Sequence, residues 1–127
     1  MGSSIIIELI TFYSIMYNFD PNLAKSVSYV ESAYKPAALG RHGEYGLFQV
    51  RPMNLEPNEM VCDLHENIKS GLRFLNETKL DCIHKGKFNW LVCYNMGKNK
   101  AKEVRHPSLF SYVKKVRHQY DKNKIQE

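Results

Sequence analysis

The longest apolar segment, residues 5–19, predicts a helix with a wide apolar face. Its large side chains recur three or four positions apart, the spacing that aligns them along a helix. They are Ile5, Leu9, Phe12, Ile15 and Met16, with Ile6, Ile10 and Tyr13 beside them. A face of this width predicts a well-buried helix. The segment also contains Glu8 and several neutral polar residues, and it is too short to span a membrane.

A second helix is predicted to begin at Asp20-Pro21, because an Asp cap followed by Pro at the first helical position is a helix start. An apolar stripe follows, formed by Leu23, Val27 and Val30. Glu31 comes next, so its carboxylate is expected at the margin of the core. A negative charge at the C-terminal end of a helix opposes the helix dipole. We therefore expect Glu31 to be kept for a function, just before a loop that contains Pro36, Gly40 and Gly43.

Residues 45–50 are too few for a helix, and the nearby Pro52 and Pro57 prevent the segment from extending. We predict a short extended piece there, the only β segment in the pattern. Three more helices follow: one opened by the capping pair Asp63 and Glu66, one stopped by Gly97, and one opened by Pro107. Their apolar positions are Leu64, Ile68, Leu72 and Leu75; Phe88, Leu91 and Val92; and Phe110, Val113, Val116 and Tyr120.

The pattern therefore predicts a mainly α fold with a very short β segment near residues 45–50. At 127 residues, of which 43% are hydrophobic, residues 1–127 fit a single domain with one modest core. We expect the ends to add little to it. Residues 1–4 resemble a remnant of cloning, and residues 121–127 are expected to form a frayed tail.

The three cysteines leave one unpaired in any intramolecular disulfide scheme, so their number does not predict an oxidised scaffold. The cysteines therefore do not indicate whether the protein works in a reducing or an oxidising compartment. Two combinations resemble zinc ligands, Cys62-x-x-His65 and Cys82-x-His84, but neither has a standard spacing. We predict no metal and no cofactor.

Charge is unevenly spread along the chain, which carries a net +5. Residues 1–68 hold 4 Lys or Arg against 8 acids, whereas residues 69–127 hold 14 against 5. Such a cationic surface attracts polyanions, either nucleic acid or an anionic cell envelope, and charge alone does not choose between them. No helix-turn-helix, zinc-finger or RNA-binding signature is present, so a non-catalytic basic helical module is the remote alternative.

Three blocks occur in order along nearly the whole chain. They are Glu31-Ser32 with Pro36 and Gly46-Leu47-Phe48-Gln49-Val50, then Asn67-Ile68-x-x-Gly71-x-x-x-Leu75, then Cys93-Tyr94-Asn95-Met96-Gly97. Together they resemble the signatures of the soluble lytic transglycosylase family (SLT domain), whose lysozyme-like fold is related to goose-type lysozyme. The segment SYVKKV at residues 111–116 is a weaker match to the last helix of the family.

The chain departs from the family pattern in informative places. Phe48 stands where the family usually has Met, and Cys93 and Met96 replace alanines, which enlarges the side chains beside the site. Glu44 stands where many members have Ala. Some relatives associated with secretion systems, and goose-type enzymes, have an acid in this neighbourhood, so Glu44 is a candidate second carboxylate. The alternative is that it caps its loop or pairs with a nearby arginine, Arg41 or Arg51.

The resemblance implies cleavage of the β-1,4 bond between N-acetylmuramic acid (MurNAc) and N-acetylglucosamine (GlcNAc) in peptidoglycan, with Glu31 as the single general acid and base. A glutamate beside an apolar stripe suits this role, because burial raises the pKa of a carboxyl group. In the route of the family, no water takes part and a 1,6-anhydroMurNAc end forms. The alternative is hydrolysis by a lysozyme that uses Glu31 with Glu44.

The same resemblance assigns roles to five further residues. Ser32 is expected to support Glu31 or the substrate, Phe48 and Gln49 to line the glycan groove, and Tyr94 and Asn95 to orient Glu31 and a sugar acetamido group. A role in the core is also expected for Phe48, and simple packing at a helix end is the alternative for Tyr94.

The implied partner is the peptidoglycan glycan strand, for a monomer that binds no nucleic acid, spans no membrane and acts in the periplasm or on the cell wall. No leader is recognisable, since no Lys or Arg precedes the apolar segment. We expect export from a longer precursor or delivery by a phage, with a secretion-system or virion scaffold as a further partner.

Overall fold

A computed structural model describes residues 2–126, and the mainly α fold predicted from the sequence is confirmed. The long helices are α1 (Ser3–Met16), α2 (Pro21–Ser32), α3 (Leu64–Cys82) and α6 (Ser111–Gln126). The short ones are α4 (Leu91–Met96) and α5 (Lys98–Ala101), with 3-10 turns η1 (Pro52–Asn54), η2 (Ile83–Lys85) and η3 (Pro107–Leu109). In the described residues the β structure is limited to isolated bridges that pair Tyr45 with Leu39 and with Val50.

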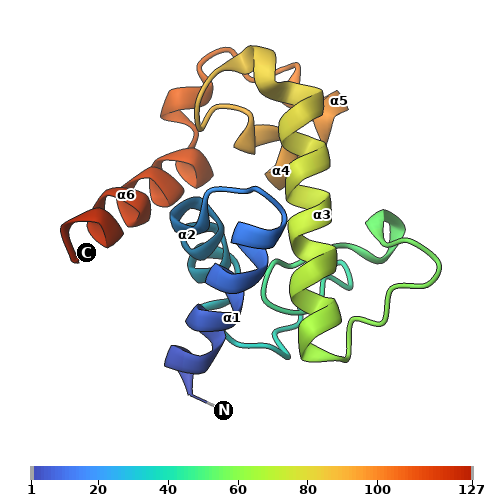
Figure 1. The fold of residues 1–127 in the computed structure, drawn as a ribbon. Coiled ribbons are helices and arrows are strands. Elements are labelled where there is room, and N and C mark those ends of the chain that lie inside the picture. The colour runs from blue at the N-terminus through green and yellow to red at the C-terminus, as the bar shows by residue number, and fades with distance from the viewer. Residues whose placement is uncertain (1, 127) are drawn as a thin grey trace.

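The long helix α3 lies at the centre of the molecule (Figure 1). Helix α2 packs against α1 and α6, and α4 packs beside α3. The loop between α2 and α3 starts on the α2 side of α3, and its later part extends on the opposite side (Figure 1). Each long helix and α4 contribute fully buried side chains to one core, among them Ile10, Val27, Leu72, Leu91 and Val113.

Two helix starts form as their capping residues predict. The Asp20 carboxylate accepts hydrogen bonds from the backbone N–H groups of Asn22 and Leu23, at 2.9 and 3.4 Å. It also accepts one from the Tyr120 hydroxyl at 2.8 Å, which ties the start of α2 to α6. The Asp63 carboxylate accepts from the Glu66 N–H at 3.0 Å and opens α3.

Helix α1 is less buried than its sequence predicts. Its core-facing residues are Ile6, Ile10 and Ser14, whereas Ile5, Phe12, Ile15 and Met16 are exposed. The prediction of a well-buried helix was wrong because α1 packs on α2 and α3 with one narrow side. Leu9 and Tyr13 are half-buried against the core, so only part of the wide predicted face is exposed to solvent.

The C-terminal helices also differ from their predicted limits. Phe88 has φ 64° and lies in the turn before α4, so it is not part of that helix. Pro107 opens the turn η3 rather than α6, and the sequence analysis did not predict α5.

The predicted frayed tail is helical over residues 121–126, since α6 continues to Gln126. The Asn123 amide donates to the Ser26 hydroxyl at 3.2 Å, and the Gln119 amide donates to Asn123 at 2.9 Å. The first bond holds the last turns of α6 against α2, and the second, within α6, fixes the Asn123 side chain. Residues 1 and 127, which belong to the predicted cloning remnant and tail, lie outside the described residues.

A disulfide bond joins Cys82, the last residue of α3, to Cys93 in α4. Cys62 is exposed and free. The odd number of cysteines left the pairing open, and the bond connects two elements that both border the cleft described next.

Candidate active site

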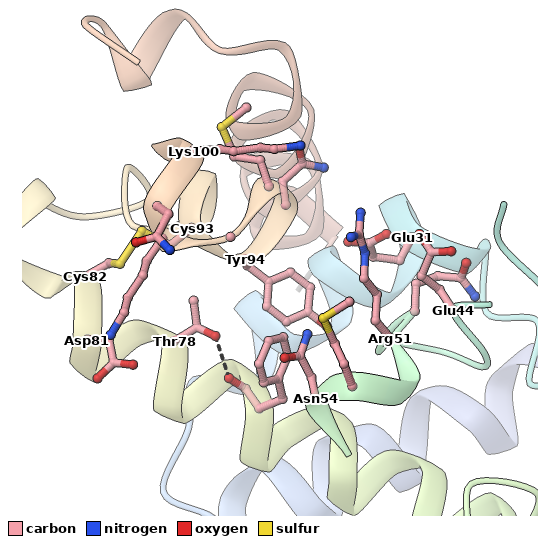
Figure 2. Close-up of a pocket in the computed structure, with 18 residues that line it drawn as sticks. Glu31, Glu44, Arg51, Asn54, Thr78, Asp81, Cys82, Cys93, Tyr94 and Lys100 are labelled. Carbon is pink, nitrogen blue, oxygen red and sulfur yellow. Dashed lines mark hydrogen bonds between the residues drawn. A yellow bond between two sulfur atoms is a disulfide. The ribbon is translucent and has the colours of Figure 1, made fainter. Parts of the chain in front are cut away.

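A cleft of about 500 Å³ is lined by residues of α3, α4, α5, the end of α2 and the loop that leads into η1. Figure 2 shows Glu31, Glu44 and Arg51 grouped in one part of it and Asp81 with the disulfide in another, with the Tyr94 ring between them. The family resemblance singled out Glu31, Glu44, Gln49, Tyr94 and Asn95, and the fold brings all five to the wall of this one cleft.

Glu31 lies in the last turn of α2 and is largely buried. Its Oε2 accepts a hydrogen bond of 2.7 Å from the hydroxyl of Tyr112 in α6. The pKa of Glu31 is raised from 4.5 to about 7. Burial is the largest cause, the Tyr112 hydrogen bond opposes it, and the negative charge of Glu44 adds to it. A carboxyl group with this pKa is half protonated near neutral pH, as a general acid requires.

The sequence pattern does not single out Tyr112, the partner of Glu31. Burial and the charge of Glu31 raise the pKa of this hydroxyl well above its ordinary value, so it stays protonated and donates. The one signal for it was the weak match of residues 111–116 to the last helix of the family. The interaction forms because α2 and α6 pack against each other.

The loop at residues 46–49 is held in place by a glycine with positive φ and by hydrogen bonds of Asn67 and Gln49. Gly46 has φ 90°, and a Cβ there would lie 2.0 Å from Nδ2 of Asn67. The Asn67 Oδ1 accepts from the Leu47 N–H at 3.1 Å. The Gln49 amide donates to the carbonyls of Ala38 and Gly46, at 2.9 and 3.0 Å. Gln49 therefore both lines the cleft and holds its own loop closed.

Ser32 is buried behind the cleft wall and is not among the residues that line it. Its hydroxyl donates to the carbonyls of Ser28 and Leu47, at 3.0 and 2.9 Å. This bond connects the end of α2, where Glu31 lies, to the 46–49 loop. Ser32 thus supports the 46–49 loop through its hydroxyl, and its side chain does not reach the cleft wall.

Phe48 lies in the core and does not line the groove, which corrects the sequence-based expectation. Its side chain is 1% exposed, and a Cβ at Gly71 would lie 2.4 Å from its ring. The ring thus occupies the space that a glycine in α3 leaves open, and its size serves packing.

Tyr94 borders the cleft, but its hydroxyl does not bind Glu31. It donates to the Phe48 carbonyl at 2.5 Å, which fixes the loop at residues 46–49 against α4. The charge of Glu31 still raises the pKa of Tyr94, after burial, so the two groups are near each other. Asn95 follows on α4, is exposed and lines the cleft.

Glu44 also lines the cleft, and its environment differs from that of Glu31. Burial acts to raise the pKa of Glu44, but the backbone N–H groups of Glu44 and His42 and the charges of His42 and Arg51 together hold it below its ordinary value. Its Oε1 accepts from the His42 N–H at 2.6 Å. The expected alternative, a loop-capping role, is therefore part of what Glu44 does.

Arg73 holds the loop that carries Met53 and Asn54 to the cleft. Its guanidinium donates to both carboxylate oxygens of Glu59 at 2.8 Å and to the Asn54 carbonyl at 2.7 Å. It also donates to Glu77, one turn further along α3, at 2.9 Å. One side chain thus fixes an irregular segment to the central helix.

A family model described as "Transglycosylase SLT domain" matches residues 8–108 of this chain, with Glu31, the 46–49 loop and Asn95 inside the match. The chain belongs to the transglycosylase SLT family. No curated protein matches it. As a family member it is a transglycosylase-type protein that acts on peptidoglycan. Tyr112 lies beyond the matched residues, which is why it stands out only in the structure.

Within residues 2–126, no helix is long and apolar enough to cross a membrane. The same residues contain no cluster of three or more His, Cys, Asp or Glu side chains placed to hold a metal ion.

Tyr112→Phe tests the hydrogen bond to Glu31. The bond favours the charged carboxylate, so its loss should raise the pKa of Glu31 and move the alkaline limb of kcat/KM to higher pH by roughly one pH unit, given about 1.5 kcal/mol for a hydrogen bond to a charged group. The pH profile of lysis measures this. Tyr13→Phe removes a hydroxyl that bonds His65 away from the cleft, and it should leave the profile unchanged. An unshifted pH profile in Tyr112→Phe would contradict the conclusion that the Tyr112 hydrogen bond lowers the pKa of Glu31.

Proposed function

We propose that the protein is a lytic transglycosylase that cleaves the β-1,4 bond between MurNAc and GlcNAc and leaves a 1,6-anhydroMurNAc end. Glu31 acts as the single general acid and base. The observation that supports this most is the combination of a pKa of about 7, a Tyr112 hydrogen bond and a position in the cleft wall. Membership of the SLT family supports the substrate.

In this reaction Glu31 first gives a proton and later takes a different one. Protonated Glu31 gives its proton to the glycosidic oxygen, which leaves as the 4-hydroxyl of GlcNAc, while the acetamido oxygen of MurNAc attacks C1. The Glu31 carboxylate then takes the proton of the C6 hydroxyl, and O6 displaces the acetamido oxygen from C1. No water is consumed. Tyr112 stabilises the carboxylate between the two steps, since its hydroxyl donates to it.

The cleft wall supplies candidate sugar contacts. Asn95 offers an exposed amide there, and the backbone around Gln49 is held rigid by the side chain of Gln49 itself. Ser32 and Phe48 act from behind, by fixing the loop at residues 46–49 to α2 and α3. Preorganised groups of this kind reduce the cost of orienting the substrate.

A second candidate function, hydrolysis, is favoured by Glu44. It lines the same cleft as Glu31, and its pKa is lowered while that of Glu31 is raised. Two carboxyl groups whose pKa values are driven apart are the arrangement of an acid and a base. An inverting lysozyme would use Glu44 to activate a water on the opposite face of the sugar.

Product masses from purified peptidoglycan decide between these functions. For the transglycosylase we expect anhydro-ended muropeptides from the wild type, and from Glu44→Gln at a rate within about threefold, because the proposed route needs no second carboxylate. A hydrolase would release reducing ends, and Glu44→Gln would lower kcat by about a hundredfold or more. Glu8→Gln, which removes an exposed carboxylate from α1, is the matched control. Reducing ends from the wild type would overturn the proposal.

The disulfide between Cys82 and Cys93 supports an extracytoplasmic site of action, since such bonds persist in oxidising compartments. We propose that the enzyme works in the periplasm or on the cell wall, as a monomer, after export from a longer precursor or delivery by a phage. A secretion-system or virion scaffold is a partner consistent with that delivery.

A further inference from the structure

The α5 side of the cleft carries two lysines that the mechanism does not use. Lys98 and Lys100 are exposed and line the cleft together with Asn99 between them. Figure 2 shows Lys100 on the side of the cleft away from Asn54. This side lies apart from the group formed by Glu31, Glu44 and Arg51 (Figure 2).

These two ammonium groups are not engaged in ion pairs within the part of the chain that the structure describes. The salt bridges found in residues 2–126 join Lys69 to Glu66 and Arg73 to three glutamates. Arg73 has a structural role, since its guanidinium donates to Glu59, Glu77 and the Asn54 carbonyl. Lys98 and Lys100 make no such bonds, so their charges are available to a molecule in the cleft.

We propose that Lys98 and Lys100 form a subsite for the carboxylates of the peptide stems that MurNAc carries. The inference rests on the proposed function, because it assumes that the cleft holds a glycan strand. A stem hangs from the lactyl group of MurNAc and bears free carboxylates, so a strand in the cleft brings anions to its walls. Asp81 lines the same cleft and opposes this attraction, but two lysines outweigh one aspartate.

A lysine is suited to this contact. Its ammonium group is a point charge on a flexible stem and can follow a mobile peptide, whereas a rigid guanidinium needs a fixed partner. The pairs are exposed, so each contributes modestly and weakens as salt is added. The subsite therefore selects stem-bearing strands over bare strands, rather than supplying the main binding affinity.

The test compares two substrates: glycan strands with their stems, and strands from which an amidase has removed them. The bare strands keep the lactyl carboxylate, so they separate that anion from those of the stem. We expect the double variant Lys98→Ala/Lys100→Ala to lose roughly three- to tenfold in kcat/KM on stem-bearing strands, mainly through KM. On bare strands its kcat/KM should match that of the wild type.

The double variant Lys114→Ala/Lys115→Ala is the matched control, since it removes the same charge from exposed positions of α6 outside the cleft. It should keep the preference for stems. Asp81→Asn should increase kcat/KM on stem-bearing strands. Equal losses on both substrates, or the same loss in the α6 control, would overturn the subsite and leave the transglycosylase in place. A wild type that cuts neither substrate would overturn both proposals.

Discussion

Glu31→Gln is expected to lower kcat on peptidoglycan by about a thousandfold, within the range of general acid–base catalysis. The amide keeps the size of the side chain and can still accept the Tyr112 hydrogen bond, but it has no proton to give to the leaving oxygen. Release of soluble muropeptides under single-turnover conditions measures the loss. Full lytic activity in this variant would exclude Glu31 as the acid.

The same substitution should leave the protein at least as stable as the wild type above neutral pH. In the folded protein the pKa of Glu31 is about 7, against 4.5 for a free glutamate, so between these values the folded state binds more protons than the unfolded state. Stability from Glu31 is thus full below pH 4.5 and is lost as pH rises to about 7. Glutamine has no charge to bury. A urea midpoint at pH 8 equal to or above that of the wild type would show that lost activity is not lost folding.

Removing the disulfide with Cys82→Ala/Cys93→Ala is expected to lower the free energy of unfolding by roughly 3 kcal/mol. The bond closes a short loop, with a sequence separation of 11, and the loop-closure entropy that it removes from the unfolded chain predicts this amount. Urea unfolding of the variant and of the wild type, each with and without reductant, measures it. The reduced wild type should match the variant.

Cys62→Ala is the control for that experiment, because Cys62 is exposed and unbonded. Its unfolding midpoint should equal that of the wild type, both with and without reductant. The double variant should also lose some activity, since α4 carries Tyr94 and Asn95 and is held to α3 by the bond. An unfolding midpoint that does not respond to reductant in any of the three proteins would contradict a structural role for the disulfide.

The sequence predicted the helices well where their signals were local. Asp20 with Pro21, and Asp63 with Glu66, fix helix starts through bonds to the next few N–H groups, and such bonds need no tertiary context. The face of α1 could not be predicted in the same way. Both sides of that helix are apolar, and which side is buried depends on where α2 and α3 lie.

The candidate site likewise has a part that local sequence predicts and a part that depends on packing. Glu31, Gln49, Tyr94 and Asn95 belong to ordered blocks and Glu44 lies just before one of them, and the structure brings all five to one cleft. The Tyr112 bond to Glu31 and the donation from Tyr94 to the Phe48 carbonyl join residues far apart in the chain, and only packing decides them. For Phe48 the expected core role is confirmed and the expected place in the groove is wrong, because an apolar residue in a motif can face either the groove or the core. Glycine at position 71 settles this in favour of the core.

The guanidinium of Arg73 has a consequence for how the enzyme responds to acidity. It stays charged throughout the range in which Glu31 titrates, and its hydrogen bonds, ahead of other influences, hold the pKa of Glu59 below its ordinary value. The Arg73 contacts that join the η1 loop to α3 therefore do not change with pH in the range where Glu31 titrates. If Glu31 acts as proposed, the pH dependence of the rate near neutrality comes from the titratable groups of the cleft, because the Arg73 contacts behind the cleft wall do not titrate in that range.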